Sequence, residues 1–459
     1  MTPRAHGCAG RTTARTIAGL AGLAAVVVCV SGAALLQPDE SWRDAQLEVR
    51  AAQRDTLGHG TEPARLDTLA LALLRVGRFD DASRIFHTAL VYQPGDAGAC
   101  AGLGKLALFA GRLAEAESLL AIAVATDRDR EWVADLYAAH VQHGAWGAAA
   151  PLAEELGDPG RAEMLRMMDA TPPRLTAGPD ESRIPWVRPY PIPLVRVKVN
   201  GELILMAIDT GARDVLLDPS AARRAKAQTF PTKSLVSWLG NRTSGANAMI
   251  QRLELGGMKL EDVPATLISL RKWSIEVNPK GESVGGVIGL SVLRSFTPTI
   301  DYVGHALVLR RPGVSYTPAA SAQRIPFEIW GESDLTVWGN LAGGRRMALT
   351  VHSGVPGCGA AAPPEVWQEV GIKAKLMSRI TKGAGSWLGG KSWTRVTLPS
   401  ASAGPITSGK LDGWSGAMDS ADLWRHGVRR DALLSNDFFN DYRVTYDWAA
   451  RSLVFETKK

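Results

Sequence analysis

The spacing of apolar residues changes character twice along the chain. No residue from Thr16 to Pro38 is charged, and the mostly apolar run Ile17–Leu36 is long enough to cross about 30 Å of hydrocarbon as a helix. Between residues 63 and 170 apolar positions recur every three to four residues, which is typical of helices packed on one face. After Pro193 they alternate with polar positions, which indicates strands. The pattern therefore predicts a targeting or anchoring segment, a helical region and a mainly β region.

The helical region repeats itself with a period of 33 or 34 residues. Its turns contain Gly77, Gly111 and Gly144, and a small residue follows each glycine by five positions, at Ala82, Ala116 and Ala149. This period and the placement of small residues and Pro94 resemble tetratricopeptide repeats. The resemblance implies stacked helix pairs over residues 63–170, with a concave surface that docks a protein or peptide. The alternative is a spacer that holds the following domain away from a membrane.

The β region opens with a hairpin that ends in a short polar motif. Residues 195–208 read as two strands joined by a tight turn at Asn200-Gly201, and the second strand runs into Asp209-Thr210-Gly211. Further along, Gly286-Val287-Ile288-Gly289 precedes a short helical pattern. This combination resembles the lobe of retropepsin-like aspartic proteases. The resemblance implies that Asp209 activates water, while Thr210, Gly211 and Gly289 support its loop.

The same plan recurs in the last third of the chain. Residues 337–351 read as a second hairpin, which ends in His352-Ser353-Gly354. Asp209 and Asp301 are 92 residues apart, and His352 and Asp447 are 95 apart. We therefore predict two homologous lobes, residues 192–315 and 323–457, of which the second is degenerate. It has a histidine where the second aspartate belongs, and Ser435 where the first lobe has Gly289.

In paired-lobe aspartic proteases two acidic groups hold a water molecule, one as base and the other as proton donor. The resemblance implies that Asp209 is the base and that His352 lies opposite it as proton donor or orienter. Ser353 and Gly354 retain the supporting hydroxyl and glycine. A carboxylate beside an imidazole raises the pKa of the imidazole, so we expect activity to move towards neutral pH.

Two alternatives remain open for this site. The second lobe could have lost catalysis, which would leave a protease fold that binds peptides without cleaving them. First lobes of two chains could also pair, bringing two copies of Asp209 together, although the covalently linked second lobe favours the internal pair. The proposed chemistry requires no metal and no cofactor.

Both lobes carry the sequence Ser-Trp-Leu-Gly between the loop motif and the closing segment. Its tryptophans, Trp238 and Trp387, fall where such lobes have a hairpin that folds over the substrate. Each could instead be an aromatic residue packed on its own lobe. Asp301 and Asp447 precede the closing strands, so we expect them to form turns rather than to act in catalysis.

Charge and cysteine content indicate the compartment in which the protein lies and the kind of partner it binds. Of the net charge of +6, three positive charges precede the first acidic residue, Asp39, so nothing indicates a nucleic-acid partner. These three charges belong to Arg4, Arg11 and Arg15. They orient the segment 1–38, a signal peptide or membrane anchor, with its N-terminus in the cytoplasm. Cys100 and Cys358 lie in separate domains, and we expect two buried thiols rather than a disulfide.

The sequence therefore predicts all-α tetratricopeptide-like helical repeats, a Pro-rich linker over residues 171–191, and a mainly β two-lobed pepsin/retropepsin-like domain. We expect an exported protein, periplasmic or membrane-anchored on the extracytoplasmic side. Its expected partners are a protein or peptide substrate, a docking protein on the repeats, and the membrane through the N-terminal segment.

Overall fold

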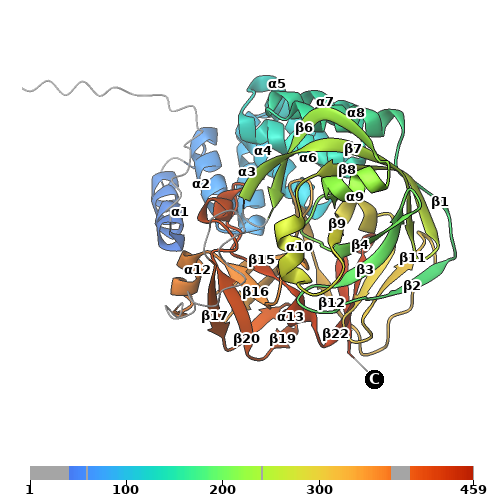
Figure 1. Ribbon diagram of the computed structural model, residues 1–459. Coiled ribbons are helices and arrows are strands. Elements are labelled where there is room, and N and C mark those ends of the chain that lie inside the picture. Colours follow the sequence, from blue (N-terminus) through green and yellow to red (C-terminus); the bar gives the residue numbers. More distant parts are fainter. Residues whose placement is uncertain (1–40, 58–59, 239–240, 374–392, 458–459) are drawn as a thin grey trace, which may run out of the picture. The chain divides into compact units, whose positions relative to one another are not determined.

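The computed structural model describes residues 41–57, 60–238, 241–373 and 393–457 (Figure 1). The segment 1–38, predicted as a signal peptide or anchor, lies outside the described residues. Within the described part of the chain, no helix is long and apolar enough to cross a membrane.

Eight helices, here called the helical array, occupy the N-terminal part. They are α1 (Trp42–Thr56), α2 (Pro63–Arg75), α3 (Phe79–Tyr92), α4 (Ala97–Ala110), α5 (Leu113–Thr126), α6 (Arg130–His143), α7 (Trp146–Glu155) and α8 (Pro159–Ala170). The repeated glycines Gly111 and Gly144 end α4 and α6 in the left-handed conformation, with φ of 74° and 79°. Gly102 lets α4 approach α3, because a Cβ there would lie 2.1 Å from the Phe86 ring. The predicted helical repeats are thus confirmed, and α1 extends the array before residue 63.

The segment predicted as a Pro-rich linker is not a free spacer. It contains β1 (Arg174–Ala177), which pairs with β8 (Met258–Leu267), and β2 (Glu181–Pro185), which pairs with β11 (Ala306–Arg310). The sequence predicted no strand in this linker, because backbone pairing to strands more than 80 residues away leaves no signature in the local sequence.

The first lobe is built on an eight-stranded sheet with the order β1-β8-β5-β9-β4-β3-β7-β6. β4 and β9 run parallel at its centre, and β6 and β7 form a long hairpin at its edge. The remaining elements are β3 (Leu194–Val199), β4 (Glu202–Ile208), β5 (Val215–Leu217), α9 (Pro219–Arg224), β6 (Gln228–Trp238), β7 (Asn241–Leu255), α10 (Arg271–Val277), β9 (Val284–Ile288) and α11 (Leu290–Leu293).

The second lobe repeats this central arrangement. β15 and β21 run parallel, as β4 and β9 do, and the antiparallel β16–β21 pair corresponds to β5–β9. The sheet contains β13 (Glu328–Trp330), β14 (Asp334–Leu341), β15 (Met347–Val351), β16 (Ala360–Ala362), β17 (Thr394–Leu398), β18 (Ala401–Ala403), β19 (Ile406–Ser408), β20 (Leu411–Ser415) and β21 (Ala432–Leu434). Three short helices accompany it, α12 (Pro364–Glu369), η2 (Ser420–Trp424) and α13 (Asn436–Phe439).

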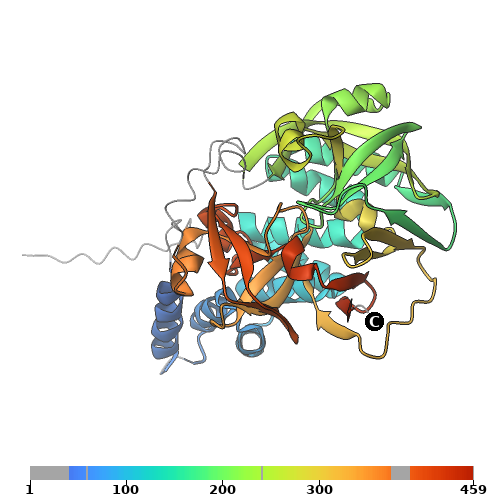
Figure 2. The ribbon, with the colours of Figure 1, turned by 60° about the horizontal axis from the view of Figure 1, so that its bottom comes forward.

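A six-stranded sheet joins the lobes, with strands from the linker segment, the first lobe and the second lobe in the order β12-β23-β22-β10-β11-β2 (Figure 2). Its strands from the lobes are β10 (Thr297–Asp301), β11, β12 (Gln323–Pro326), β22 (Tyr442–Asp447) and β23 (Ser452–Thr457). β10 and β22 pair antiparallel, and the hydroxyls of Thr299 and Thr445 meet at 2.6 Å. The two strands that end in Asp301 and Asp447, which the spacing in the sequence matches to each other, are therefore hydrogen-bonded neighbours. The fold is the predicted two-lobed, mainly β domain.

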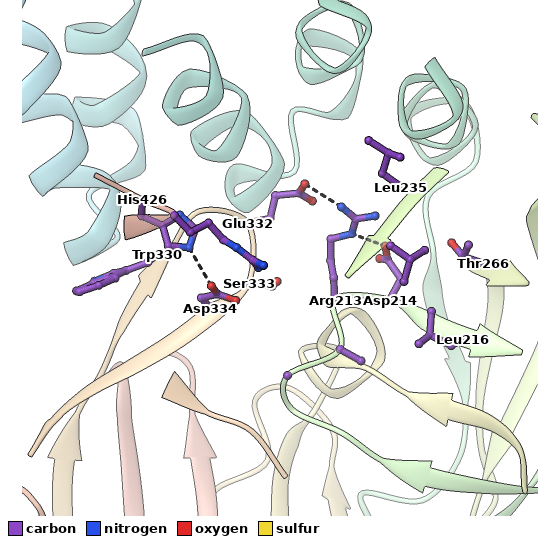
Figure 3. Close-up of a pocket in the computed structure, with 14 residues that line it drawn as sticks. Arg213, Asp214, Leu216, Leu235, Thr266, Trp330, Glu332, Ser333, Asp334 and His426 are labelled. Atoms are coloured by element: carbon purple, nitrogen blue, oxygen red, sulfur yellow. Dashed lines mark hydrogen bonds and ion pairs between the residues drawn. The ribbon is translucent and has the colours of Figure 1, made fainter. Parts of the chain in front are cut away.

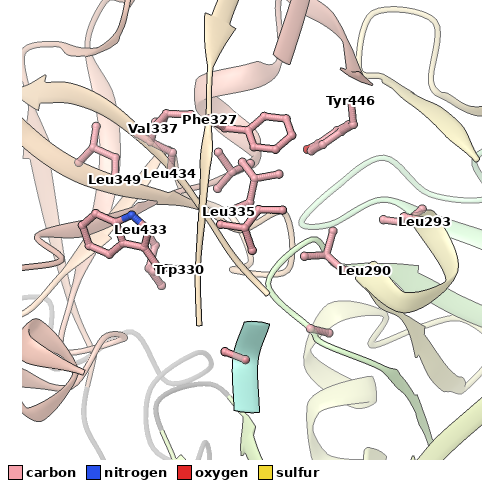
Figure 4. Close-up of a cluster of buried hydrophobic side chains, with 14 of the residues drawn as sticks. Leu290, Leu293, Phe327, Trp330, Leu335, Val337, Leu349, Leu433, Leu434 and Tyr446 are labelled. Atoms are coloured by element: carbon pink, nitrogen blue, oxygen red, sulfur yellow. The ribbon is translucent and has the colours of Figure 1, made fainter. Parts of the chain in front are cut away.

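A large apolar core extends through the helical array and both lobes. Leu290 and Leu293 of α11 face side chains of the second lobe such as Leu335 and Tyr446 (Figure 4). The array joins this core through Phe79 and Phe109, which contact Trp330; the rings of Phe109 and Trp330 stack at 5.0 Å. Cys100 and Cys358 are both free thiols and both buried, as predicted.

Candidate active site

The two predicted motifs occupy equivalent positions at the ends of parallel strand pairs. Asp209 follows β4, and its backbone N–H donates to the carbonyl of Ile288 at the end of β9, at 3.0 Å. His352 follows β15, and its N–H donates to the carbonyl of Leu434 at the end of β21, at 2.8 Å. The same backbone bond thus fixes each motif loop to its own lobe.

The hydroxyl residues of the motifs lock the two loops together. The Thr210 hydroxyl donates to the carbonyl of Val351 at 3.2 Å, and the Ser353 hydroxyl donates to the carbonyl of Ile208 at 3.1 Å. Each hydroxyl also accepts the other residue's backbone N–H, at 3.0 and 3.1 Å. All four groups are buried, so this reciprocal set holds the two motifs in one fixed relation.

The glycines allow the loops to approach. A Cβ on Gly211 would lie 2.2 Å from Cδ2 of His352, and a Cβ on Gly354 would lie 2.1 Å from Cγ of Asp209. Neither glycine has a positive φ, so the requirement is close approach rather than backbone conformation. Each glycine therefore packs against the titratable side chain of the opposite lobe.

These contacts place Asp209 and His352 side by side within a single chain. Nδ1 of His352 lies 3.0 Å from Oδ1 of Asp209, which also accepts the N–H of Gly211 at 2.8 Å. The Asp209 side chain is 2% exposed and that of His352 is 19% exposed. Burial lowers the pKa of His352, but the adjacent Asp209 carboxylate outweighs it, so the pKa stands above its ordinary value.

Beneath the motif loops, the first lobe has Gly289 where the second lobe has Ser435. A Cβ on Gly289 would lie 2.7 Å from the carbonyl oxygen of Ala212, so the first lobe requires glycine there. In the second lobe the Ser435 hydroxyl donates to the carbonyl of Val355 at 2.8 Å. The serine is therefore accommodated by a hydrogen bond rather than by a disrupted loop.

Several residues around His352 were not found from the sequence. The buried Asn436 donates to the carbonyl of Ser353 at 2.7 Å. Asp334 lines the same small cavity as His352 and binds Arg430 at 2.6 Å and Nε2 of His426 at 2.8 Å. None of these residues belongs to a motif. Only Asn436 could have been noticed in the sequence, because it directly follows Ser435, the residue equivalent to Gly289.

A cavity of about 210 Å³ opens beside the motif loop of the first lobe (Figure 3). Leu235 and Val236 of the β6–β7 hairpin line it on one side, and Trp330 and Glu332 of the second lobe on the other. The cavity also includes Gly211, Ala212, Arg213, Asp214, Leu216, Thr266, Ser333, Asp334, Arg425 and His426. Charged residues of both signs therefore surround the space nearest the Asp209 loop.

The structure describes one of the two predicted flap tryptophans, Trp238. Trp238 ends β6 in the expected hairpin, but its ring packs edge-on against Trp273 of the same lobe at 5.3 Å. Among the described hairpin residues it is Leu235 and Val236 that face the cavity. Trp387 lies outside the described residues.

The acidic residues expected in turns do form turns. Asp301 accepts the N–H of Gly304 at 2.7 Å, and Asp447 accepts the N–H of Ala450 at 3.0 Å. Over the ranges that the structure covers, no three or more His, Cys, Asp or Glu side chains gather as metal ligands.

Two family models match separate parts of the chain. Residues 195–292 match the model described as aspartyl protease, and residues 73–139 match the model described as tetratricopeptide repeat. The crystal structure of an aspartic proteinase from Irpex lacteus is similar over 61% of this chain and 98% of its own, with 12% identity and a TM-score of 0.41. No curated protein matches the chain. The first family match contains Asp209-Thr210-Gly211 and Gly289, so the chain carries an aspartyl protease domain together with a tetratricopeptide repeat.

Proposed function

We propose that this protein is an aspartic-type endopeptidase in which His352 takes the place of the second catalytic aspartate. The observation that carries the proposal is the contact of Asp209 and His352 at 3.0 Å, on loops joined by reciprocal hydrogen bonds. The interlocking hydroxyls of Thr210 and Ser353 and the closely packed glycines hold this pair of side chains together.

In this mechanism the Asp209 carboxylate takes a proton from a water molecule, whose oxygen attacks the carbonyl carbon of the peptide bond. His352, whose pKa the Asp209 carboxylate raises, in its protonated form donates a hydrogen bond to the carbonyl oxygen and then protonates the leaving amine as the C–N bond breaks. The N–H of Gly211 orients the Asp209 carboxylate throughout. The two side chains thus act as base and acid with one ionised group of each sign.

The competing function is a catalytically inactive, peptide-binding protease fold. The cavity beside the Asp209 loop could hold a peptide segment in either case. The tetratricopeptide region, a common protein-docking element, would then recruit or present the partner. Turnover distinguishes the two functions.

We further propose that the domain acts outside the cytoplasm, either released or tethered by residues 1–38. The support is the apolar run Ile17–Leu36, with three arginines before it and two acidic residues directly after Pro38. Alkaline phosphatase fused after residue 40 should be active in bacterial cells, whereas an inactive fusion would contradict export.

The test of function is digestion of a peptide library by the full chain, wild type beside Asp209→Asn and His352→Asn, from about pH 4 to about pH 8. We expect cleavage by the wild type and a loss of at least about 100-fold in Asp209→Asn, the size of an acid–base contribution. Equal residual cleavage in wild type and Asp209→Asn would contradict the proposal. Peptide binding without any cleavage would favour the inactive fold, and a pH profile unchanged in His352→Asn would remove His352 from the mechanism.

A further inference from the structure

The N-terminus of α8, the last helix of the array, lies against the β6–β7 hairpin that borders the cavity (Figure 1). Asp158 caps α8 by accepting the N–H of Arg161, and its second carboxylate oxygen accepts the N–H of Leu235 at 3.1 Å. Asn247 of β7 donates to the carbonyl of Gly160 at 2.7 Å. Asp158 thus accepts a hydrogen bond from Leu235, a hairpin residue that lines the cavity.

The fit between helix and hairpin is close. A Cβ on Gly160 would lie 2.1 Å from the carbonyl oxygen of Lys233, so only glycine permits this approach. Asn247 is fully buried, and its carbonyl oxygen accepts the hydroxyl of the buried Ser234 at 2.7 Å. The hairpin is therefore attached to α8 by the buried bond of Asn247 to Gly160 and by the exposed bond of Leu235 to Asp158.

Arg161, three residues after the cap, joins α8 to both lobes. Its Nη1 donates to Asp214 of the first lobe at 3.0 Å, and its Nη2 donates to Glu332 of the second lobe at 2.7 Å. Tyr137 of α6 also donates to Glu332. The Arg161 side chain is 3% exposed, and it holds the pKa of both Asp214 and Glu332 below the ordinary value despite their burial.

This ion cluster lies at the edge of the cavity. Arg213 bonds to the same two carboxylates, Asp214 and Glu332, as Figure 3 shows. Asp214 is only five residues beyond Asp209, and the intervening loop contains Gly211, which packs on His352. Arg161 therefore bridges the loop that follows the aspartate and the second-lobe turn across from it.

We propose that Arg161 is a positioning residue of the active site, and that α8 holds the β6–β7 hairpin and the two lobes in the arrangement needed for turnover. The array is then a working part of the protease as well as a docking element. This inference rests on the proposed function for its kinetic consequence, but its structural consequence can be measured without any activity.

The test compares Arg161→Gln, Arg161→Lys and Asn247→Ala in the full chain. The control is Arg166→Gln, on the same helix as Arg161, which removes an exposed ion pair with Glu154 of α7. Hydrogen exchange is followed in residues 228–255 and, for comparison, in helices α2–α4. Peptide cleavage gives kcat and KM separately.

We expect exchange in the hairpin to accelerate on the order of tenfold in Asn247→Ala and Arg161→Gln, with α2–α4 unchanged, because only local attachment is lost. Asn247→Ala should mainly raise KM, while Arg161→Gln should mainly lower kcat, on the order of tenfold or more, through displacement of the motif loop. Arg161→Lys should lie between, because one ammonium cannot reproduce the fork that meets both carboxylates. Arg166→Gln should match the wild type.

Each result decides the inference. Unchanged hairpin exchange in both Arg161→Gln and Asn247→Ala would overturn it, whatever the activity. Faster exchange with unchanged kcat and KM would show that the attachment does not position the site, and would overturn the role of Arg161. If no protein cleaves any peptide, the proposed function fails, while the exchange data still test the attachment. If Arg161→Gln does not fold, Asn247→Ala, which leaves the ion cluster intact, carries the test.

Discussion

At the scale of single residues, the site depends on a charge pair with a definite pH dependence. The raised pKa of His352 means that the folded state binds its proton more tightly than the unfolded state does. The stabilisation is therefore fully present below the unfolded pKa and is lost as the pH rises through the folded pKa. We predict that the advantage of wild type over His352→Asn in unfolding free energy is largest below the ordinary histidine pKa of about 6.5 and shrinks as the pH rises above it.

Urea unfolding of the wild type, both single variants and the double variant Asp209→Asn/His352→Asn provides the measurement. The double-mutant cycle isolates the coupling between the two side chains from their separate contributions. A coupling that grows with rising pH would mean that the ion pair is not the source of the shift.

The glycines of the motifs give a second prediction at this scale. Gly354→Ala should lower activity by at least about 100-fold, because its Cβ would occupy space 2.1 Å from Cγ of Asp209 and the carboxylate would have to move. The matched control is Gly409→Ala, since a Cβ at Gly409 meets open space. Peptide cleavage rates at fixed pH decide the matter, and equal activity of the two variants would argue against the close packing.

At the scale of elements, the β6–β7 hairpin places an exposed apolar side chain at the cavity. Leu235 is 57% exposed and lines the cavity, whereas Leu203 is 50% exposed and lies on β4 outside that lining. We predict that Leu235→Ser raises KM several-fold, while its unfolding free energy changes by no more than about 0.5 kcal/mol. Leu203→Ser should change neither quantity, and an equal KM in both variants would exclude Leu235 from substrate contact.

The elements that could be predicted from sequence are those whose signal is local. The repeat period of the array, the hairpin turn at Asn200-Gly201 and the two loop motifs all lie within short windows. The correspondence of Asp301 and Asp447 also followed from matched spacing, and the strands that end in these two residues pair directly. β1 and β2 were not predicted, because their strand partners lie far along the chain and the prolines around them indicated a linker.

The candidate site was predictable only as far as its motifs extend. Asp209, His352 and their supporting residues could be predicted from the two tripeptide motifs and from the similar distances between each motif and the aspartate that follows it, Asp301 or Asp447. The ion pairs of Asp334, Glu332 and Arg161 could not be predicted from the sequence. The position of a charged residue does not indicate which residue it pairs with when the partner lies 50 or more residues away. Such ion clusters depend on the assembled tertiary structure, and the sequence alone presents Arg161 as one more helix residue.

At the scale of the whole molecule, the array and the lobes share apolar surface, and this determines how the protein unfolds. Phe109 of α4 is 1% exposed and stacks on Trp330, a fully buried residue of the second lobe, while Phe79 packs edge-on against Trp338 at 5.6 Å. Separation of the array would expose these rings to water, so the two parts should unfold together.

We predict one calorimetric transition for the helical array and the two lobes together. Phe109→Ala should shift this whole transition to lower temperature and lower the free energy of unfolding by about 3–5 kcal/mol, the usual cost of deleting a buried phenylalanine. An internal array residue supplies the comparison: Leu120 is fully buried under α4, against Gly104, and its truncation to alanine should shift the same transition. Two separate transitions, with only the array transition moving in both variants, would mean that the aromatic contact does not couple the parts. In that case the repeats would be an appended docking domain, and the contacts of α8 with the hairpin would have to hold the lobes without support from the rest of the array.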